Sequence, residues 1–195
     1  MNKIYNNLNI DNLMKTEEYK YFNKEQKEEI RLGLLQALDV SVYANLEYNW
    51  KQMFLIREGL ENNLDVSVYA KPVFNDEQMR EIYFGLDKNI DVSVYAKPEF
   101  DWKQMQEIRE GLEKNLDVSI YAKEEFTFSQ MEQIKYGLES NLDVSIYAKK
   151  DFCSYQMNKI RKLFKKNRIK AIFYAKITYF LNKINLNFLE ESRVC

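Results

Sequence analysis

All five glycines of this chain lie at intervals of 26 residues, each inside the same pattern of residues. In register, the copies read F-x-x-x-Q-M-x-x-I-x-x-G-L-x-x-N-L-D-V-S-[VI]-Y-A-K, and no insertion separates one copy from the next. A fixed period of this kind is typical of tandem-repeat proteins, in which each copy packs mainly on its neighbours. The glycines are Gly33, Gly59, Gly85, Gly111 and Gly137.

The first half of each copy has the pattern of a helix of about a dozen residues. An Asn, Asp or Thr is followed three positions later by Gln, as in Asn49 and Gln52, which predicts a capping box at the helix start. An aromatic residue precedes the cap, and Tyr48 with Met53 has the spacing of a hydrophobic staple. The predicted caps are Asn23, Asn49, Asn75, Asp101 and Thr127.

The second half of each copy, D-V-S-[VI]-Y-A, has two possible structures. Asn63 suits a left-handed helix C-terminus and Asp65 suits a new N-cap, which together predict a second, short helix. The alternation of apolar residues in Leu-x-Val-x-Ile-x-Ala is also compatible with a short strand lining a horseshoe. We favour the helix because Asp and Ala are poor strand residues.

The conserved spacing of the glycines needs a structural reason, because a glycine inside a helix costs about 1 kcal/mol relative to alanine. We expect the missing side chain to let a neighbouring helix approach closely, so that Gly85→Ala would be destabilising. The degenerate sixth copy has Leu163 at this position, which fits an end copy with one neighbour missing.

These patterns predict an all-α fold, an α-solenoid of five to six stacked two-helix repeats with a long C-terminal capping helix. We expect a single elongated domain over residues 1–195, with an N-terminal half repeat (1–21), five repeats (22–150) and a degenerate basic repeat with the capping helix (151–195). Apolar residues at helical spacing near the C-terminus are expected to cover the open end of the core. They are Ile169, Ile172, Phe173, Ile177, Phe180, Ile184 and Phe188.

The chain has no apolar signal-peptide core and no apolar run near the ~20 residues that cross a bilayer. We therefore expect a cytoplasmic protein with no membrane partner. Binding to a membrane surface is also disfavoured if the core uses the apolar side of the C-terminal helix.

The chemistry of the side chains argues against catalysis. The chain has no histidine, and no phosphate loop, zinc spacing or EF-hand loop. Asp, Ser and Tyr recur together, as in Asp91, Ser93 and Tyr95, but five equivalent copies indicate capping and core packing and not one active site. We expect no enzyme activity, catalytic residue, metal, cofactor or small-molecule substrate.

Positions that vary between copies are where a partner can be recognised, because invariant positions face other copies. Tryptophan is enriched among binding hot spots. A basic column accompanies the variable aromatic residues and consists of Arg31, Arg57, Arg109, Lys135 and Arg161, interrupted by Tyr83. The predicted partner-binding residues, with a protein as the favoured partner, are Trp50, Arg57, Tyr83, Phe84, Trp102 and Arg109.

Charge is concentrated near the C-terminus. Residues 152–189 contain nine Lys or Arg and no acidic residue, which leaves 20 basic against 30 acidic residues in the rest of the chain. These lysines can simply keep a capping helix soluble, or they can bind RNA, a ribonucleoprotein or an acidic protein face. The candidate residues are Arg161, Lys162, Lys165, Lys166, Arg168 and Lys170.

The sequence of the repeat also resembles that of other repeat proteins. The sequence F-[DN]-W-x-Q-M-x-x-I-R-x-G-L-E-x-N-L-D-V-S-x-Y-A-K-P, over about residues 22–150, resembles uncharacterised tandem helical-repeat proteins of low-GC Gram-positive bacteria and their mobile elements. It is similar in logic to tetratricopeptide arrays, although its period is shorter than theirs. The resemblance implies an interaction scaffold, and the mobile-element context implies an inhibitor of host defence such as an anti-CRISPR protein.

Overall fold

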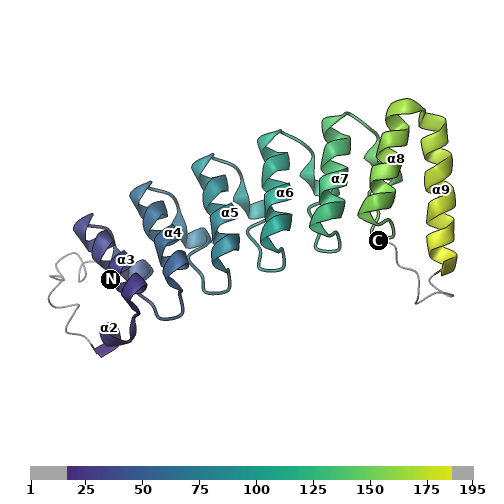
Figure 1. Ribbon diagram of the computed structural model, residues 1–195. Helices are drawn as coiled ribbons and strands as arrows, with labels where there is room; N and C mark the ends of the chain where they lie inside the picture. Colours follow the sequence, from purple (N-terminus) through teal and green to yellow (C-terminus); the bar gives the residue numbers. More distant parts are fainter. Residues whose placement is uncertain (1–16, 186–195) are drawn as a thin grey trace. The chain divides into compact units, whose positions relative to one another are not determined.

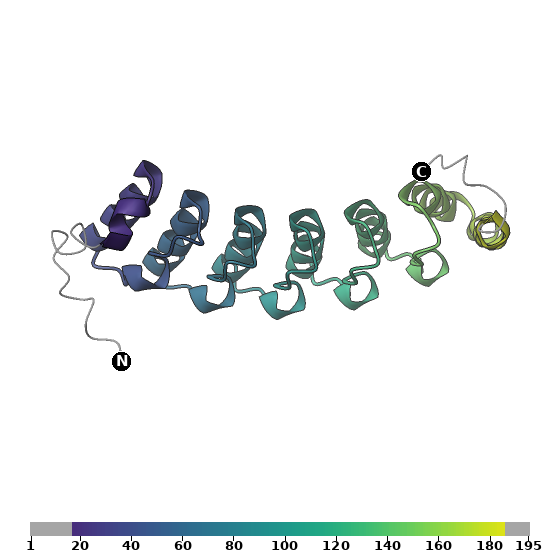
Figure 2. The ribbon, with the colours of Figure 1, turned by 90° about the horizontal axis from the view of Figure 1, so that it is seen from below.

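The structure is a computed structural model that describes residues 17–185, and within that range it is helical with no strand. The chain forms two compact units, Met1–Trp102 and Lys103–Cys195. In both units, α-helices alternate with short 3₁₀ turns and stack side by side (Figures 1 and 2). The predicted all-α solenoid class is therefore confirmed, and the strand alternative for D-V-S-x-Y-A is wrong.

In the first unit, α3 packs against α4 and α4 packs against α5 (Figure 1). In the second unit, α7 packs on α8, and α8 packs on the terminal helix α9. The described elements of the first unit are α2 (Glu17–Tyr21), α3 (Lys24–Leu35), η2 (Val40–Val42), α4 (Trp50–Glu61), η3 (Val66–Val68), α5 (Asp76–Asp87) and η4 (Val92–Val94). Those of the second unit are α6 (Trp102–Glu113, which starts on the last residue of the first unit), η5 (Val118–Ile120), α7 (Phe128–Glu139), η6 (Val144–Ile146), α8 (Ser154–Lys166) and α9 (Arg168–Asn185).

The predicted capping boxes are present at α3, α4, α5 and α7, where the cap side chain and the glutamine satisfy each other's backbone N–H groups. The glutamine side chain also makes a second contact, to the next repeat, that the sequence did not predict. Gln52 Nε2 donates to the carbonyl oxygen of Phe74 in the next repeat at 2.7 Å, and Gln130 does the same to Phe152. One side chain thus caps its own helix and also holds the following repeat.

The helices α4, α5, α6 and α7 end as the asparagines predict. Asn63 has φ +57°, in the left-handed region, and the other asparagines of this column have similar values. Asp65 then accepts hydrogen bonds from the backbone N–H and hydroxyl of Ser67, which starts the 3₁₀ turn. The second helix of each repeat is therefore real, but it is a single 3₁₀ turn of three residues. The asparagines at positive φ are Asn63, Asn89, Asn115 and Asn141, while the first repeat has Ala37 there.

The glycines mark a close contact, as predicted, but the neighbour differs from the prediction. A Cβ atom at Gly33 would overlap Tyr43 Oη and lie 3.0 Å from Val40 Cγ1. The tyrosine comes from the 3₁₀ turn of the same repeat, not from a neighbouring helix. Its hydroxyl donates to the carbonyl oxygen of Glu29 at 3.0 Å, so it crosses the helix directly over the glycine. All five glycines have this arrangement.

The core of each unit repeats the same few side chains. Met53, Ile56 and Tyr69 are fully buried, and the Met, Ile and Tyr side chains at these positions of the other repeats are buried to the same degree. The aromatic residue before each cap is also buried, at 6% exposure or less. The apolar residues that recur in the repeat are therefore core residues, and the recurring Asn, Asp and Gln are capping residues.

The terminal helix contradicts one expectation. The side chains of α9 that are buried are small: Ala171, Ala175 and Thr178. The predicted core residues Phe173 and Phe180 are instead 66% and 64% exposed. Small residues allow close helix packing, so the alanine side of α9 is the one that fits against α8. Phe188 and the predicted half repeat before Glu17 lie outside the described residues.

Candidate partner-binding surfaces

Two residues of the basic column, Arg57 and Lys135, lie between neighbouring helices and not on an open surface. Arg57 in α4 is only 6% exposed, and its Nε donates to Glu29 Oε2 in α3 at 2.8 Å. The same guanidinium also pairs with Glu58 and Glu61 at 3.0 and 3.2 Å. Burial opposes ionisation of Arg57, but the hydrogen bonds and charge of these carboxylates outweigh it and raise its pKa. Arg57 thus joins two repeats.

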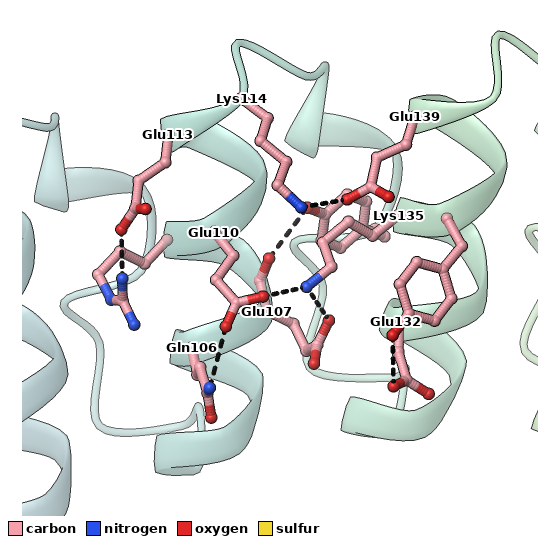
Figure 3. A network of polar contacts seen from close by, with 11 residues as sticks. Gln106, Glu107, Glu110, Glu113, Lys114, Glu132, Lys135 and Glu139 are labelled. Atoms are coloured by element: carbon pink, nitrogen blue, oxygen red, sulfur yellow. Dashed lines mark hydrogen bonds and ion pairs between the residues drawn. The ribbon is translucent and has the colours of Figure 1, made fainter.

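The second unit has a corresponding cluster around Lys135 (Figure 3). The Lys135 ammonium is 3% exposed, lies 2.8 Å from Glu107 Oε2 and also pairs with Glu110 of α6. Burial raises the pKa of Glu107 despite this lysine. For Glu110, burial acts in the same direction, but hydrogen bonds from Lys135 and Gln106 outweigh it and lower the pKa. A second ion pair joins Lys114 to Glu139 at 2.6 Å.

Two of the six residues predicted to bind a protein partner are therefore inside the protein. Arg109, like Arg57, is buried, at 8% exposure, and pairs with Glu113 of its own helix. Burial leaves little of either guanidinium to a partner. The sequence could not separate a basic recognition column from a basic packing column, because both place one cation in each repeat.

The other four residues lie on or near the surface of the first unit. Trp50 begins α4 and is 42% exposed, with Lys51 Nζ 6.0 Å from its ring centre. Phe84 on α5 is 38% exposed and packs edge-on against Tyr83, with ring centres 5.8 Å apart. Tyr83 is half-buried, and its hydroxyl accepts a hydrogen bond from Asn62 Nδ2 at 3.0 Å. Trp102 is half-buried.

Two further residues complete this surface and were not predicted. Phe54 is 38% exposed and lies one helical turn after Trp50, so the two rings share one side of α4. Arg80 is exposed on α5, and its guanidinium lies 6.0 Å from the ring centre of Trp102. The spacing of Trp50 and Phe54 was visible in the sequence as an i, i+4 pair. We call the set Trp50, Phe54, Arg80, Phe84 and Trp102 the aromatic surface.

Five of the six predicted anion-binding residues are exposed in the second unit. Lys162, Lys165 and Lys166 lie on α8, and Arg168 and Lys170 begin α9. Arg168 approaches Asp143 to 3.8 Å, a loose surface pair. Arg161 differs from the others, because its guanidinium donates to Gln133 Oε1 at 3.2 Å and takes part in the same inter-repeat column as Arg57.

Residues 17–185 contain no cluster of acidic or cysteine side chains that could hold a metal ion. Asp91 and Ser93 are hydrogen-bonded to each other in a turn, and the Tyr95 hydroxyl donates to a helix carbonyl. None of the described helices is long and apolar enough to cross a membrane.

The fold and these surfaces define an α-solenoid repeat protein. Comparison of the chain with protein-family models, with curated proteins and with solved structures finds no match.

Proposed function

We propose that the protein is a non-catalytic scaffold that binds a partner protein through the aromatic surface of its first unit. The observation that carries this proposal is the contrast between invariant and variable positions. The recurring Met, Ile and Tyr side chains of the repeat are fully buried, whereas Trp50, Phe54 and Phe84 are each about two-fifths exposed. The packing of the repeats does not require an aromatic residue at these positions, since some copies hold charged side chains there, such as Asp76 for Trp50, Arg80 for Phe54 and Glu58 for Phe84.

The composition of the aromatic surface suits a protein interface. Aromatic residues and Arg are enriched in the cores of such interfaces, where a few of them supply most of the binding free energy. Arg80 lies among the aromatic rings and offers a planar group that can stack or pair with a carboxylate. The finer expectation, an inhibitor of a defence protein such as a CRISPR effector, is part of this proposal and has its support in the repeat resemblance alone.

The test is affinity capture with the full chain from a native-host lysate and a phage-infected lysate, analysed for both protein and RNA. Trp50→Ala with Phe54→Ala should weaken capture of the partner by about a hundredfold or more, the effect of losing two hot-spot residues. The matched control is Leu35→Ala, which removes an apolar side chain that is 61% exposed outside the aromatic surface. Equal capture by all three proteins would contradict the proposal.

An alternative function is binding of RNA or a ribonucleoprotein by the basic residues of α8 and α9. Its support is the exposure of Lys162, Lys165, Lys166 and Lys170. Binding to phosphate backbone would fall steeply with the logarithm of salt concentration, and reversal of these four charges to Glu would abolish it. Capture that ignores this reversal and depends on Trp50 favours the first function.

A further inference from the structure

The terminal helix α9 presents an apolar face that the other described residues of the second unit, up to residue 185, do not cover. Its buried side, through Ala171, Ala175 and Thr178, packs against α8, while six large apolar side chains are between 42% and 79% exposed. At 100° per residue these six fall within one stripe about 120° wide, on the side of the helix away from the alanines. We call this stripe the α9 apolar face: Ile169, Phe173, Ile177, Phe180, Leu181 and Ile184.

The charged side chains of α9 itself all have one sign. Lys170, Lys176 and Lys183 are exposed on α9, and no acidic residue occurs anywhere between residues 152 and 185. A second copy of the chain would bring the same cations against each other, so charge repulsion opposes pairing of two α9 helices. A nucleic acid would satisfy the lysines but would leave the phenylalanine and isoleucine side chains in water. The occupant must be both anionic and apolar.

We propose that α9 docks the second unit onto the surface of an anionic membrane. A helix with a broad apolar stripe, Phe and Leu side chains and a rim of Lys lies in the plane of the headgroup and acyl boundary. The lysines can extend their charged ends to lipid phosphates while their stems cover apolar surface. Such a surface requires no directional hydrogen bonds, and the six residues of the face offer none.

This inference reverses an expectation from the sequence. Membrane-surface binding was disfavoured on the premise that the core uses the apolar residues of the C-terminal helix. The structure removes that premise, because α9 packs through its alanines and keeps its large side chains outside. Docking would therefore need no rearrangement of the helix pair α8 and α9.

The experiment is flotation of the full-length protein with vesicles of phosphatidylglycerol and phosphatidylcholine, and with vesicles of phosphatidylcholine alone. The wild-type protein should float with the anionic vesicles and much less with the neutral ones. Phe173→Asp with Phe180→Asp should reduce the partition by about tenfold or more, since two exposed apolar anchors are replaced by anions. Both side chains are exposed, so the variant should keep its helical circular dichroism and melting temperature.

Two further variants separate the contribution of the lysine charges from that of the apolar side chains. Lys170→Glu with Lys176→Glu and Lys183→Glu should remove the preference for anionic lipid. Tyr21→Asp, at an aromatic residue of α2 that is 74% exposed, is the matched control and should float like the wild type. The Phe173 and Phe180 variant should also keep its capture of the partner protein, so failure of this inference would be distinguishable from failure of the proposed function.

Three results would overturn the inference. The first is no flotation of the wild-type protein with anionic vesicles. The second is flotation that the Phe173 and Phe180 variant retains in full. The third is a dimer, or a nucleic-acid or protein complex, that depends on these two phenylalanines while the vesicles bind nothing.

Discussion

At the scale of single residues, the repeat is organised by one contact between a glycine and a tyrosine. The tyrosine hydroxyl needs a hydrogen-bond acceptor because the side chain is fully buried, and the nearest acceptor is a helix carbonyl. Only a residue without a side chain lets the hydroxyl reach that carbonyl. The glycine is therefore conserved between copies because of the tyrosine that follows it ten residues later in the sequence.

This contact predicts a specific coupling in the first repeat. Gly33→Ala should destabilise the fold by about 1–3 kcal/mol, because the added methyl overlaps Tyr43 Oη. Tyr43→Phe alone should cost about 1 kcal/mol through the lost hydrogen bond. The double variant should lose clearly less than the sum, since removal of the hydroxyl makes room for the methyl. Thermal unfolding of the four proteins measures the coupling, and additive losses would contradict the account.

The buried tyrosines also predict the response to alkaline pH. Burial raises the pKa of the phenols of Tyr43, Tyr69, Tyr121 and Tyr147 above the ordinary value near 10. Above about pH 10 the unfolded chain loses these protons before the folded chain does, so the free energy of unfolding decreases as pH rises. Below that pH the contribution is complete.

The measurement is the free energy of unfolding between about pH 8 and 11. Each buried tyrosine should contribute a slope of about 1.4 kcal/mol per pH unit above pH 10, so Tyr147→Phe should make the decline shallower. Tyr155→Phe, at an exposed tyrosine, is the control and should leave the decline unchanged. A decline that Tyr147→Phe does not alter would contradict the assignment.

At the scale of secondary-structure elements, neighbouring repeats are joined by two kinds of polar contact. The capping glutamine reaches the next repeat's backbone, and the basic column reaches the previous repeat's carboxylate or amide. The residue in the basic column and the residue that faces it on the previous helix change together from copy to copy. Glu29 faces Arg57 and Gln133 faces Arg161, whereas the corresponding positions in the copy between α4 and α5 hold the uncharged Leu55 and Tyr83.

This correspondence predicts that one pair can replace another. Arg57→Tyr alone should destabilise by about 3 kcal/mol, because it leaves Glu29 buried without its cation. Glu29→Leu with Arg57→Tyr reproduces the uncharged combination found in the chain itself and should recover most of the loss. Melting curves decide between the two outcomes. A double variant as unstable as the single one would show that the two positions do not act as a pair.

The elements also show what the sequence could and could not predict. Capping boxes, left-handed asparagines and the alternation of a long and a short helix follow from local chemistry, and the structure confirms them. The direction of each side chain depends on packing between elements and was harder to predict. Arg57 and Arg109 looked like recognition residues and are buried, and the apolar side of α9 looked like core and is exposed. Periodicity predicted that a helix has an apolar face, but it did not predict whether a neighbouring element covers that face.

At the scale of the whole molecule, different positions of the repeat have different roles, and this difference links the fold to the proposed function. Invariant residues build the stacked repeats, and copy-specific residues form the aromatic surface on the first unit. The second unit has a different kind of surface on its last helices, where exposed lysines lie beside the α9 apolar face. The two surfaces belong to different units and can be altered separately, which makes the two proposals independent.

The most direct test of this difference is site-specific photo-crosslinking in the native host. A photoreactive amino acid replaces Trp50, a variable and exposed position, in one protein, and Ser67, an invariant and exposed turn position, in the other. We predict a specific crosslinked partner protein from the position of Trp50 and none from the position of Ser67. Crosslinks of equal yield from both positions, or from Ser67 alone, would contradict the claim that the variable residues are the binding surface.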